Sequence, residues 1–430
     1  MPRLSPKEDK NKDSIHWIWF VLVVIIGAWL RLSFFSSMEW KEDEQNAYVM
    51  AGNFLKHPTF LPYGLKTSMG DIYELPLFIY TTTLFRWLGR TPLGTVVWVV
   101  LLNIIGLAAA AYGLFRSRWR WIALVALAFF AVSPWAITFS RKLWSPDLIL
   151  PFLIPALALF VRVLQKSRSR AIFPLLCLIA LASEMYLPTV ALAVALAWTA
   201  WRRKVQFHQP SLMAGIGVSV ALFFPWAVFT MVSHFTGEAR LQLISPFKFI
   251  SIFVSNAHMV PLKHPFSFAT GWEATYALAD DEFMKFMRWP CGWLTGFIHL
   301  ATAILAWPFM EGLVEVIKLG HTRDAEPEYA TAFAALIFFP LFMLMSPIDV
   351  YPHHMIPAMP YVFVAIALGF FAIYRRVTPW FGDKAARCLV GAWIIVSLVA
   401  TAAIYPLMMT FINAQGGSSG DYGVPYVLQK

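Results

Sequence analysis

The 430-residue sequence predicts an all-α protein that crosses a membrane many times, and three observations indicate this fold class. Hydrophobic residues make up 59% of the chain, whereas soluble proteins contain about 45–50%. These residues gather in runs close to the ~20 residues that a helix needs to cross a bilayer. Charged residues make up only 13%, and the basic ones lie in short loops between the runs. The net charge of +10 therefore indicates orientation in a membrane rather than binding to nucleic acid.

Eleven apolar runs are candidate membrane spans. In chain order they cover residues 15–35, 92–115, 121–139, 147–164, 171–186, 188–201, 211–233, 291–309, 330–346, 355–373 and 387–411. The first run is too long for a signal peptide and no small-residue cleavage site follows it, so we expect it to remain as an anchor. Basic clusters fall on alternate loops, which places the N-terminus in the cytoplasm and the C-terminus outside. We therefore expect a multi-pass protein of the inner or plasma membrane.

The spans divide the chain into three parts. Residues 1–14 are polar and are predicted to form a disordered cytoplasmic tail. Residues 15–411 are predicted to form the membrane domain, and the Gly/Ser-rich residues 412–430 a short external tail. Two long loops, 36–91 and 234–290, fall on the external side and are the natural place for a functional site.

Three consecutive acids, Glu42, Asp43 and Glu44, stand in the first external loop. Apolar residues follow them at helical spacing, so we expect the acids to begin a helix that lies on the membrane surface. Adjacent carboxylates repel one another, which should raise the pKa of at least one of them. A carboxylate placed there can act as a general base towards a hydroxyl or an amine. A solvated helix start would explain the same acids.

The run SPWAITFSRKLWSPD places Arg141 and Lys142 on the external side, where the positive-inside rule disfavours them. An arginine fork beside a lysine and Trp144 suits a phosphate group. The alternatives are contact with lipid headgroups, or an ion pair with Asp147.

The run SPIDVYPHHMIPAMP brings His353, His354 and Tyr351 to the same external face. Adjacent histidines rarely share one metal ion, so hydrogen bonding to a phosphate or sugar is the better hypothesis. An interfacial Tyr/His belt is the alternative. The residues considered as lining for a substrate are Glu42, Arg31, Tyr63, Lys66, Asp147, Glu184 and Tyr351.

Four segments together resemble a known family. They are Asp43-Glu44 after the first span, Leu61–Gly89, Ser133–Asp147 and Tyr351–Gly369. In this order they resemble the GT-C glycosyltransferases, specifically the polyprenyl-phosphate-sugar branch with protein O-mannosyltransferases and the aminoarabinose transferases of lipid A. The resemblance implies a GT-C-like fold with two surface helices in the first loop, near Asp43–Lys56 and Tyr73–Leu88.

The resemblance also implies the roles of the site residues. Asp43, with Glu44 beside it, would be the catalytic base, and Glu42 stays an alternative carboxylate. Arg141 and Lys142 would hold the phosphate of the donor, with His353 or His354. Many relatives carry a large C-terminal periplasmic domain that this chain lacks, which leaves open the recognition of the acceptor and a partner protein that could supply it.

The sequence therefore predicts an inverting glycosyltransferase with its active site on the periplasmic or external face. Its partners would be a polyprenyl-phosphate-linked sugar donor, a lipid, glycan or protein acceptor, and membrane lipids, without nucleic acid. No cofactor is required by this chemistry and no metal site is predicted, although the acidic loop leaves a divalent cation open. A lipid or glycolipid transporter and a non-catalytic membrane scaffold are the other classes considered. No internal repeat of the transporter kind is visible.

Overall fold

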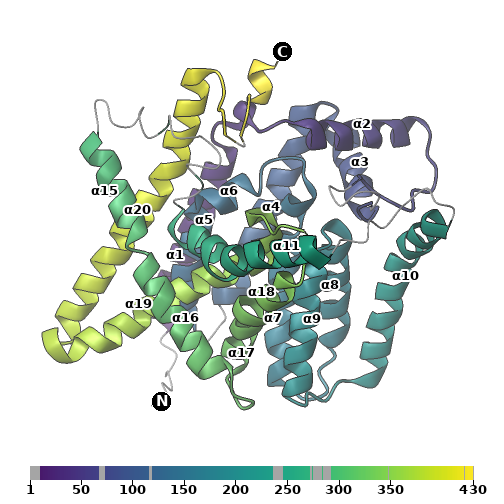
Figure 1. Ribbon diagram of the computed structural model, residues 1–430. Helices are drawn as coiled ribbons and strands as arrows, with labels where there is room; N and C mark the ends of the chain where they lie inside the picture. Colours follow the sequence, from purple (N-terminus) through teal and green to yellow (C-terminus); the bar gives the residue numbers. More distant parts are fainter. Residues whose placement is uncertain are drawn as a thin grey trace.

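The computed structural model describes residues 10–66, 73–115, 119–235, 246–271, 292–346, 348–420 and 422–429, together with Ala274 and Phe283. Throughout these residues the regular structure is helical, and β pairing is confined to one isolated bridge between Lys66 and Tyr73. The all-α fold class is therefore confirmed (Figure 1).

The apolar helices lie largely within the predicted spans, except that α16 continues to Gly320, past the predicted end at residue 309. They are α1 (Lys10–Leu32), α4 (Pro92–Phe115), α5 (Arg120–Val132), α7 (Leu150–Gln165), α8 (Ile172–Met185), α9 (Thr189–Arg202), α10 (Gln209–Phe235), α15 (Gly292–Ala303), α16 (Ala306–Gly320), α17 (Pro327–Phe333), α18 (Phe339–Leu344), α19 (Met359–Phe381) and α20 (Asp383–Gln415). Within the described residues, six helical stretches are long and apolar enough to cross a membrane, and shorter apolar helices occupy the remaining predicted spans. The chain is an integral multi-pass membrane protein, while the number of eleven crossings stays a prediction.

Helices α16 and α19 cross closely, without side chains between them at two glycines. A Cβ on Gly312 of α16 would lie 1.7 Å from the carbonyl oxygen of Ala365, and one on Gly369 of α19 would lie 1.7 Å from that of Pro308. Small residues of this kind let helix backbones touch, which gains van der Waals contact in a membrane. The candidate span Pro352–Phe381, which contains α19, is accordingly the most buried of the six, at 78% of its apolar window.

Helix α10 lies at the edge of the bundle (Figure 1), and only 6% of its apolar window is buried. A helix that is apolar all round and exposed on most sides is suited to lipid. Its last turns contact the first loop, because Trp226 Nε1 donates to the Tyr73 carbonyl at 2.8 Å and Phe229 stacks on Tyr63 with centroids 4.2 Å apart.

The first loop carries two helices, α2 (Glu42–Lys56) and α3 (Leu77–Gly89), close to the predicted pair. The acids begin α2 because the Glu44 carboxylate turns back and accepts a hydrogen bond from the Lys41 backbone N–H at 2.8 Å. The two helices pack through Gly52, where a Cβ would meet the Arg86 guanidinium at 2.0 Å. That guanidinium also lies over the Tyr48 ring.

Shorter helices connect these elements. They are η1 (Phe35–Ser37), α6 (Pro134–Thr138), η2 (Ser145–Leu148), α11 (Pro246–His258), η3 (Met259–Lys263), α12 (His264–Thr270), η5 (Pro352–Ala358) and η6 (Tyr426–Leu428). η6, near the end of the described chain, lies at the same end of the molecule as α2 (Figure 1). Of the predicted loop 234–290, the structure describes α11 to α12 and a few single positions, and the remainder lies outside the described residues.

Candidate active site

A cavity of about 530 Å³ opens at the α2 end of the bundle. Its polar lining comes from the first loop, the α6–α7 connection, the α11–α12 segment and the turn before α19. The residues are Glu39, Lys41, Asp43, Glu44, Thr138, Lys142, Ser255, Lys263, His264, Asp349, Tyr351 and His353. Trp135, Phe139, Trp144, Met259, Val350 and Pro352 complete the wall. The three polar clusters that the sequence singles out therefore meet in one place.

A second cavity, of about 660 Å³, is larger but lies among α7, α8, α9 and the start of α10. Among the described residues, its lining is mostly apolar, with Arg202, Lys204 and Arg323 as the charged members and no carboxylate. It has cations but no group that could accept a proton from an acceptor, so the smaller cavity is the candidate active site.

Lys142 is the buried cation of this site. Its Nζ lies 3.2 Å from Glu39 Oε2, and the side chains of the two residues are 9% and 5% exposed. The same nitrogen lies 3.9 Å from the centroid of the Trp144 ring. Burial disfavours the ammonium, but the nearby carboxylates of Glu39, Glu44 and Asp147 outweigh it and raise the pKa of Lys142. Lys142 is therefore a fixed positive charge at the cavity wall.

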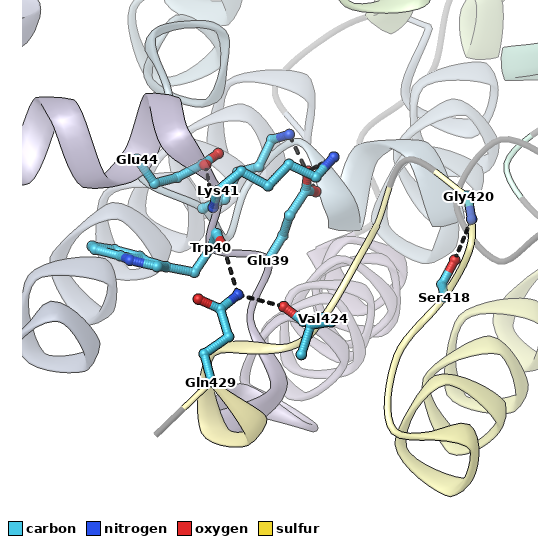
Figure 2. A network of polar contacts seen from close by, with 9 residues as sticks. Glu39, Trp40, Lys41, Glu44, Ser418, Gly420, Val424 and Gln429 are labelled. Carbon is cyan, nitrogen blue, oxygen red and sulfur yellow. Dashed lines mark hydrogen bonds and ion pairs between the residues drawn. The ribbon is translucent and has the colours of Figure 1, made fainter.

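Glu39 is a site residue that the sequence analysis missed. Its carboxylate bridges two lysines. Lys41 Nζ lies 2.9 Å from Oε1 (Figure 2), and Lys142 Nζ lies 3.2 Å from Oε2. The interpretation of the loop considered only the three consecutive acids, although Glu39 stands three residues before them. The signal that could have found it is Lys142 itself, because a buried ammonium requires a counterion.

The structure separates the three consecutive acids. Asp43 lines the cavity, is exposed, and has no hydrogen-bond or ion-pair partner in the described part of the chain. Glu44 also lines the cavity but is only 2% exposed, and burial raises its pKa to about 7. Glu42 is exposed and does not line the cavity. Of the three consecutive acids, Asp43 is therefore the one that an acceptor in the cavity can reach without displacing a partner.

A second carboxyl with a raised pKa joins the first loop to the α6–α7 connection. Glu74 Oε1 accepts a hydrogen bond from the Ser145 hydroxyl at 3.0 Å. Burial raises the pKa of Glu74 to about 7, the hydrogen bond from Ser145 opposes this, and the charge of Asp43 adds to it. Glu74 does not line the cavity. Its field near Asp43 makes it part of the electrostatics of the site, and the sequence analysis did not single it out.

Arg141 and Asp147 build the loop that presents Lys142. The Arg141 guanidinium donates to the backbone carbonyls of Ser33 at 2.6 Å and Phe34 at 2.7 Å. Asp147 Oδ2 accepts from the backbone N–H groups of Arg141 at 3.2 Å and Lys142 at 3.0 Å. Neither residue lines the cavity. Both therefore act on the shape of the site from behind its wall.

The two histidines also differ in position. His353 lines the cavity, with its ring centroid 4.7 Å from Trp144 and 5.8 Å from Tyr351. His354 does not line it, and its Nδ1 accepts a hydrogen bond from the Tyr351 backbone N–H at 3.0 Å. Asn256 holds the turn before α19 in place. Its side-chain amide donates to the Ile348 carbonyl at 3.0 Å and accepts from the Val350 N–H at 2.8 Å.

Four other candidate residues do not line the cavity: Arg31, Tyr63, Lys66 and Glu184. The Arg31 guanidinium donates to the backbone carbonyls of Gly27 and Ala131, both at 3.0 Å, and is 1% exposed. Tyr63 stacks on α10, Lys66 forms the isolated bridge, and Glu184 is buried near the end of α8. In the described part of the chain, no three His, Cys, Asp or Glu side chains are grouped as a metal site would need.

The fold of the chain was compared with those of known proteins. No protein-family model matches the chain. No curated protein sequence matches it. Among solved structures, ArnT from Cupriavidus metallidurans in the apo state is similar over 96% of this chain and 84% of its own, with a TM-score of 0.55 and 13% identity. The structure of the same protein bound to undecaprenyl phosphate matches 93% of this chain and 77% of its own, with a TM-score of 0.50 and 13% identity.

The oligosaccharyltransferase from Archaeoglobus fulgidus in the apo form is also similar, with a TM-score of 0.53 and 12% identity. The match covers 96% of this chain but only 57% of that larger protein. At 12–13% identity these likenesses establish the fold, and the chemistry has to be argued from the residues of the site. The chain is an all-α membrane protein with a GT-C-like fold.

Proposed function

We propose that this protein is an inverting glycosyltransferase that moves a sugar from a polyprenyl-phosphate donor to an acceptor at the cavity. The observation that carries the proposal is the pairing of an unpartnered carboxylate, Asp43, with a buried ammonium, Lys142, in the lining of one cavity. Transfer from a lipid phosphate needs both a base for the acceptor and a cation for the leaving group. The fold shared with ArnT, whose structure holds undecaprenyl phosphate, supports this donor class.

In the proposed reaction Asp43 takes the proton from an acceptor hydroxyl or amine as that group attacks the anomeric carbon. The bond between this carbon and the phosphate oxygen breaks, and the electron pair leaves with the polyprenyl phosphate. A positioned base of this kind contributes about 10²- to 10⁴-fold to the rate. Attack from the face opposite the phosphate inverts the configuration at the anomeric carbon.

Lys142 would meet the charge that develops on the phosphate, and His353 on the same wall would add a hydrogen bond. Glu39 keeps the ammonium charged and in place. Arg141 acts as a positioning residue, because its guanidinium fixes the Ser33–Phe34 backbone. The charge of the leaving group is thus balanced by the protein, and we expect release of polyprenyl phosphate to persist in EDTA.

The site would face the periplasm or cell exterior of the inner or plasma membrane, with the N-terminus in the cytoplasm. This proposal rests on the basic clusters of alternate loops, which predict a cytoplasmic N-terminus, and on the first loop, which follows the first span and lines the cavity. The acceptor would be a lipid, a glycan or a protein, and a partner protein is one way to present it.

The test is release of polyprenyl phosphate by purified protein in detergent, with a panel of undecaprenyl-phosphate sugars as donors and acceptor extracts added. We expect release by the wild type, loss in Asp43→Asn, and little change in Glu42→Gln, which removes the neighbouring acid that does not line the cavity. Equal release by wild type and Asp43→Asn would mean that another carboxylate is the base. Donor bound but never cleaved, by any variant, would favour a transporter or a scaffold subunit.

A further inference from the structure

The C-terminal segment 416–429 folds back onto the first loop and bonds the backbone just before α2 (Figure 2). Its three donors are the Tyr422 hydroxyl, the Tyr426 backbone N–H and the Gln429 side-chain amide. They reach the carbonyl oxygens of Ser37, of Met38 at 3.0 Å and of Trp40 at 2.7 Å. Contacts between residues 385 to 389 positions apart therefore define the course of this short backbone stretch.

This segment has a fold of its own although its composition is that of a flexible linker. Gly416, with φ 77°, ends α20, and Gly423, with φ 65°, turns the chain, both in the left-handed region that favours glycine. The Ser418 hydroxyl accepts from the Gly420 N–H at 2.9 Å, and the Gln429 amide also donates to Val424 at 2.6 Å (Figure 2). The glycines and serines thus form a defined turn.

Packing accompanies the hydrogen bonds. Tyr422 is 2% exposed, and Tyr426 meets the Trp40 ring edge to face with centroids 5.4 Å apart. A Cβ on Gly423 would lie 3.6 Å from Lys41 Cε, so the segment runs directly past one of the two lysines that bind Glu39. The segment therefore contacts both the backbone and the side chains of the first loop.

The backbone at the start of the same loop is held by Arg141, which bonds the carbonyls of Ser33 and Phe34. Glu39 stands between Met38 and Trp40, whose carbonyls are bonded by the C-terminal segment. Glu39 in turn holds Lys142 at 3.2 Å, and α2 with Asp43 begins two residues after Trp40. The C-terminal segment is consequently one contact away from the proposed phosphate ligand and from the start of the helix that bears the proposed base.

We propose that residues 416–429 are a positioning part of the active site, which holds the Ser37–Lys41 backbone so that Glu39 and Asp43 face the cavity. This inference rests on the proposed function. The segment binds the first loop as an intramolecular ligand, so a separate peptide of the same sequence could take its place. Displacement of catalytic groups by about 1 Å can lower the rate about 100-fold, so its removal should act on turnover.

The experiment compares the full chain with a variant that ends at Gln415, and adds back a synthetic peptide of residues 416–430. Fluorescence anisotropy of labelled peptide measures docking without any substrate, and release of polyprenyl phosphate measures turnover. We expect the truncated protein to bind the peptide and to lose about tenfold or more in kcat, and the peptide to restore it. A peptide with Gln429→Ala should bind and restore less, whereas one with Val427→Ala, at a side chain 44% exposed, should match the parent.

The outcomes separate the two proposals. If the full chain releases no polyprenyl phosphate while the peptide docks, the proposed function fails and docking stands. Equal kcat in the truncated and full chains would overturn the positioning role. If the truncated protein does not fold, Tyr422→Phe and Gln429→Ala in the full chain decide: a lower kcat with an unchanged melting temperature supports positioning, and an unchanged kcat overturns it.

Discussion

Replacement of Lys142 by methionine removes the cation of the buried pair with Glu39 and keeps most of the side-chain volume. The Glu39 side chain is 5% exposed, so its carboxylate stays out of water. Removing one partner of a buried pair costs about 3–5 kcal/mol. Here Glu39 retains Lys41 Nζ at 2.9 Å, on a side chain that is 43% exposed. We therefore place the loss of unfolding free energy near the lower limit, at about 3 kcal/mol.

A double-mutant cycle tests the physical reason for this loss. Glu39→Gln alone should lower the free energy of unfolding by less, because Lys142 is still stabilised by the nearby charges of Glu44 and Asp147. The double variant Lys142→Met with Glu39→Gln no longer buries an unpaired charge, so we expect a coupling energy of about 1–3 kcal/mol. Reversible unfolding in sodium dodecyl sulfate, followed by circular dichroism, gives the four free energies. Strictly additive costs would refute the buried pair and with it the view of Lys142 as a charge held by Glu39.

Two further predictions concern pH and packing. The pKa of Glu44 rises from 4.5 to about 7 on burial, so between these values the folded state holds the extra proton and stability falls as pH rises. This titration lowers the free energy of unfolding by at most about 1.4 kcal/mol per pH unit. In melting curves from pH 5 to pH 8, the Glu44→Gln variant should therefore show a smaller loss of stability than the wild type. The Glu42→Gln variant, changed at an exposed acid, should follow the wild type. Gly312→Ala should cost about 3 kcal/mol or more, because a Cβ would lie 1.7 Å from the Ala365 carbonyl oxygen. Gly391→Ala, with nothing within 4 Å, should be neutral or gain about 0.5–1 kcal/mol of helix stability. An equal melting temperature for the two alanine variants would contradict the close crossing of α16 and α19.

Periodicity and run length carry information about local structure, and these features could be predicted from the sequence. The apolar runs become helices, and the acids followed by helically spaced apolar residues become the surface helix α2. The positive-inside pattern predicts that Lys142 and His353 lie on the same side of the membrane as Asp43, which was enough to expect a shared site, and all three line one cavity. In each case the pattern lies within a single stretch of chain.

The residues that sequence reasoning missed depend on contacts between distant stretches. Glu39 gains its role from Lys142, 103 positions away, and the Gly/Ser-rich tail gains its fold from the first loop. Arg141 matches the chemistry of a phosphate ligand, yet its guanidinium meets two backbone carbonyls. An arginine offers the same donors to a phosphate and to a carbonyl, so residue type alone does not distinguish the two partners.

The measurement that tests the central claim most directly is the affinity of the purified protein for undecaprenyl phosphate, compared with turnover in the same variants. Asp43 is the proposed base and Lys142 the proposed ligand of the phosphate, so the Asp43→Asn protein should bind undecaprenyl phosphate with unchanged Kd and release no product. Lys142→Met with Glu39→Gln, which carries no unpaired charge, should bind about tenfold to a hundredfold more weakly. Unchanged affinity in that double variant, or loss of affinity in Asp43→Asn, would contradict the division of the cavity into a base and a phosphate site.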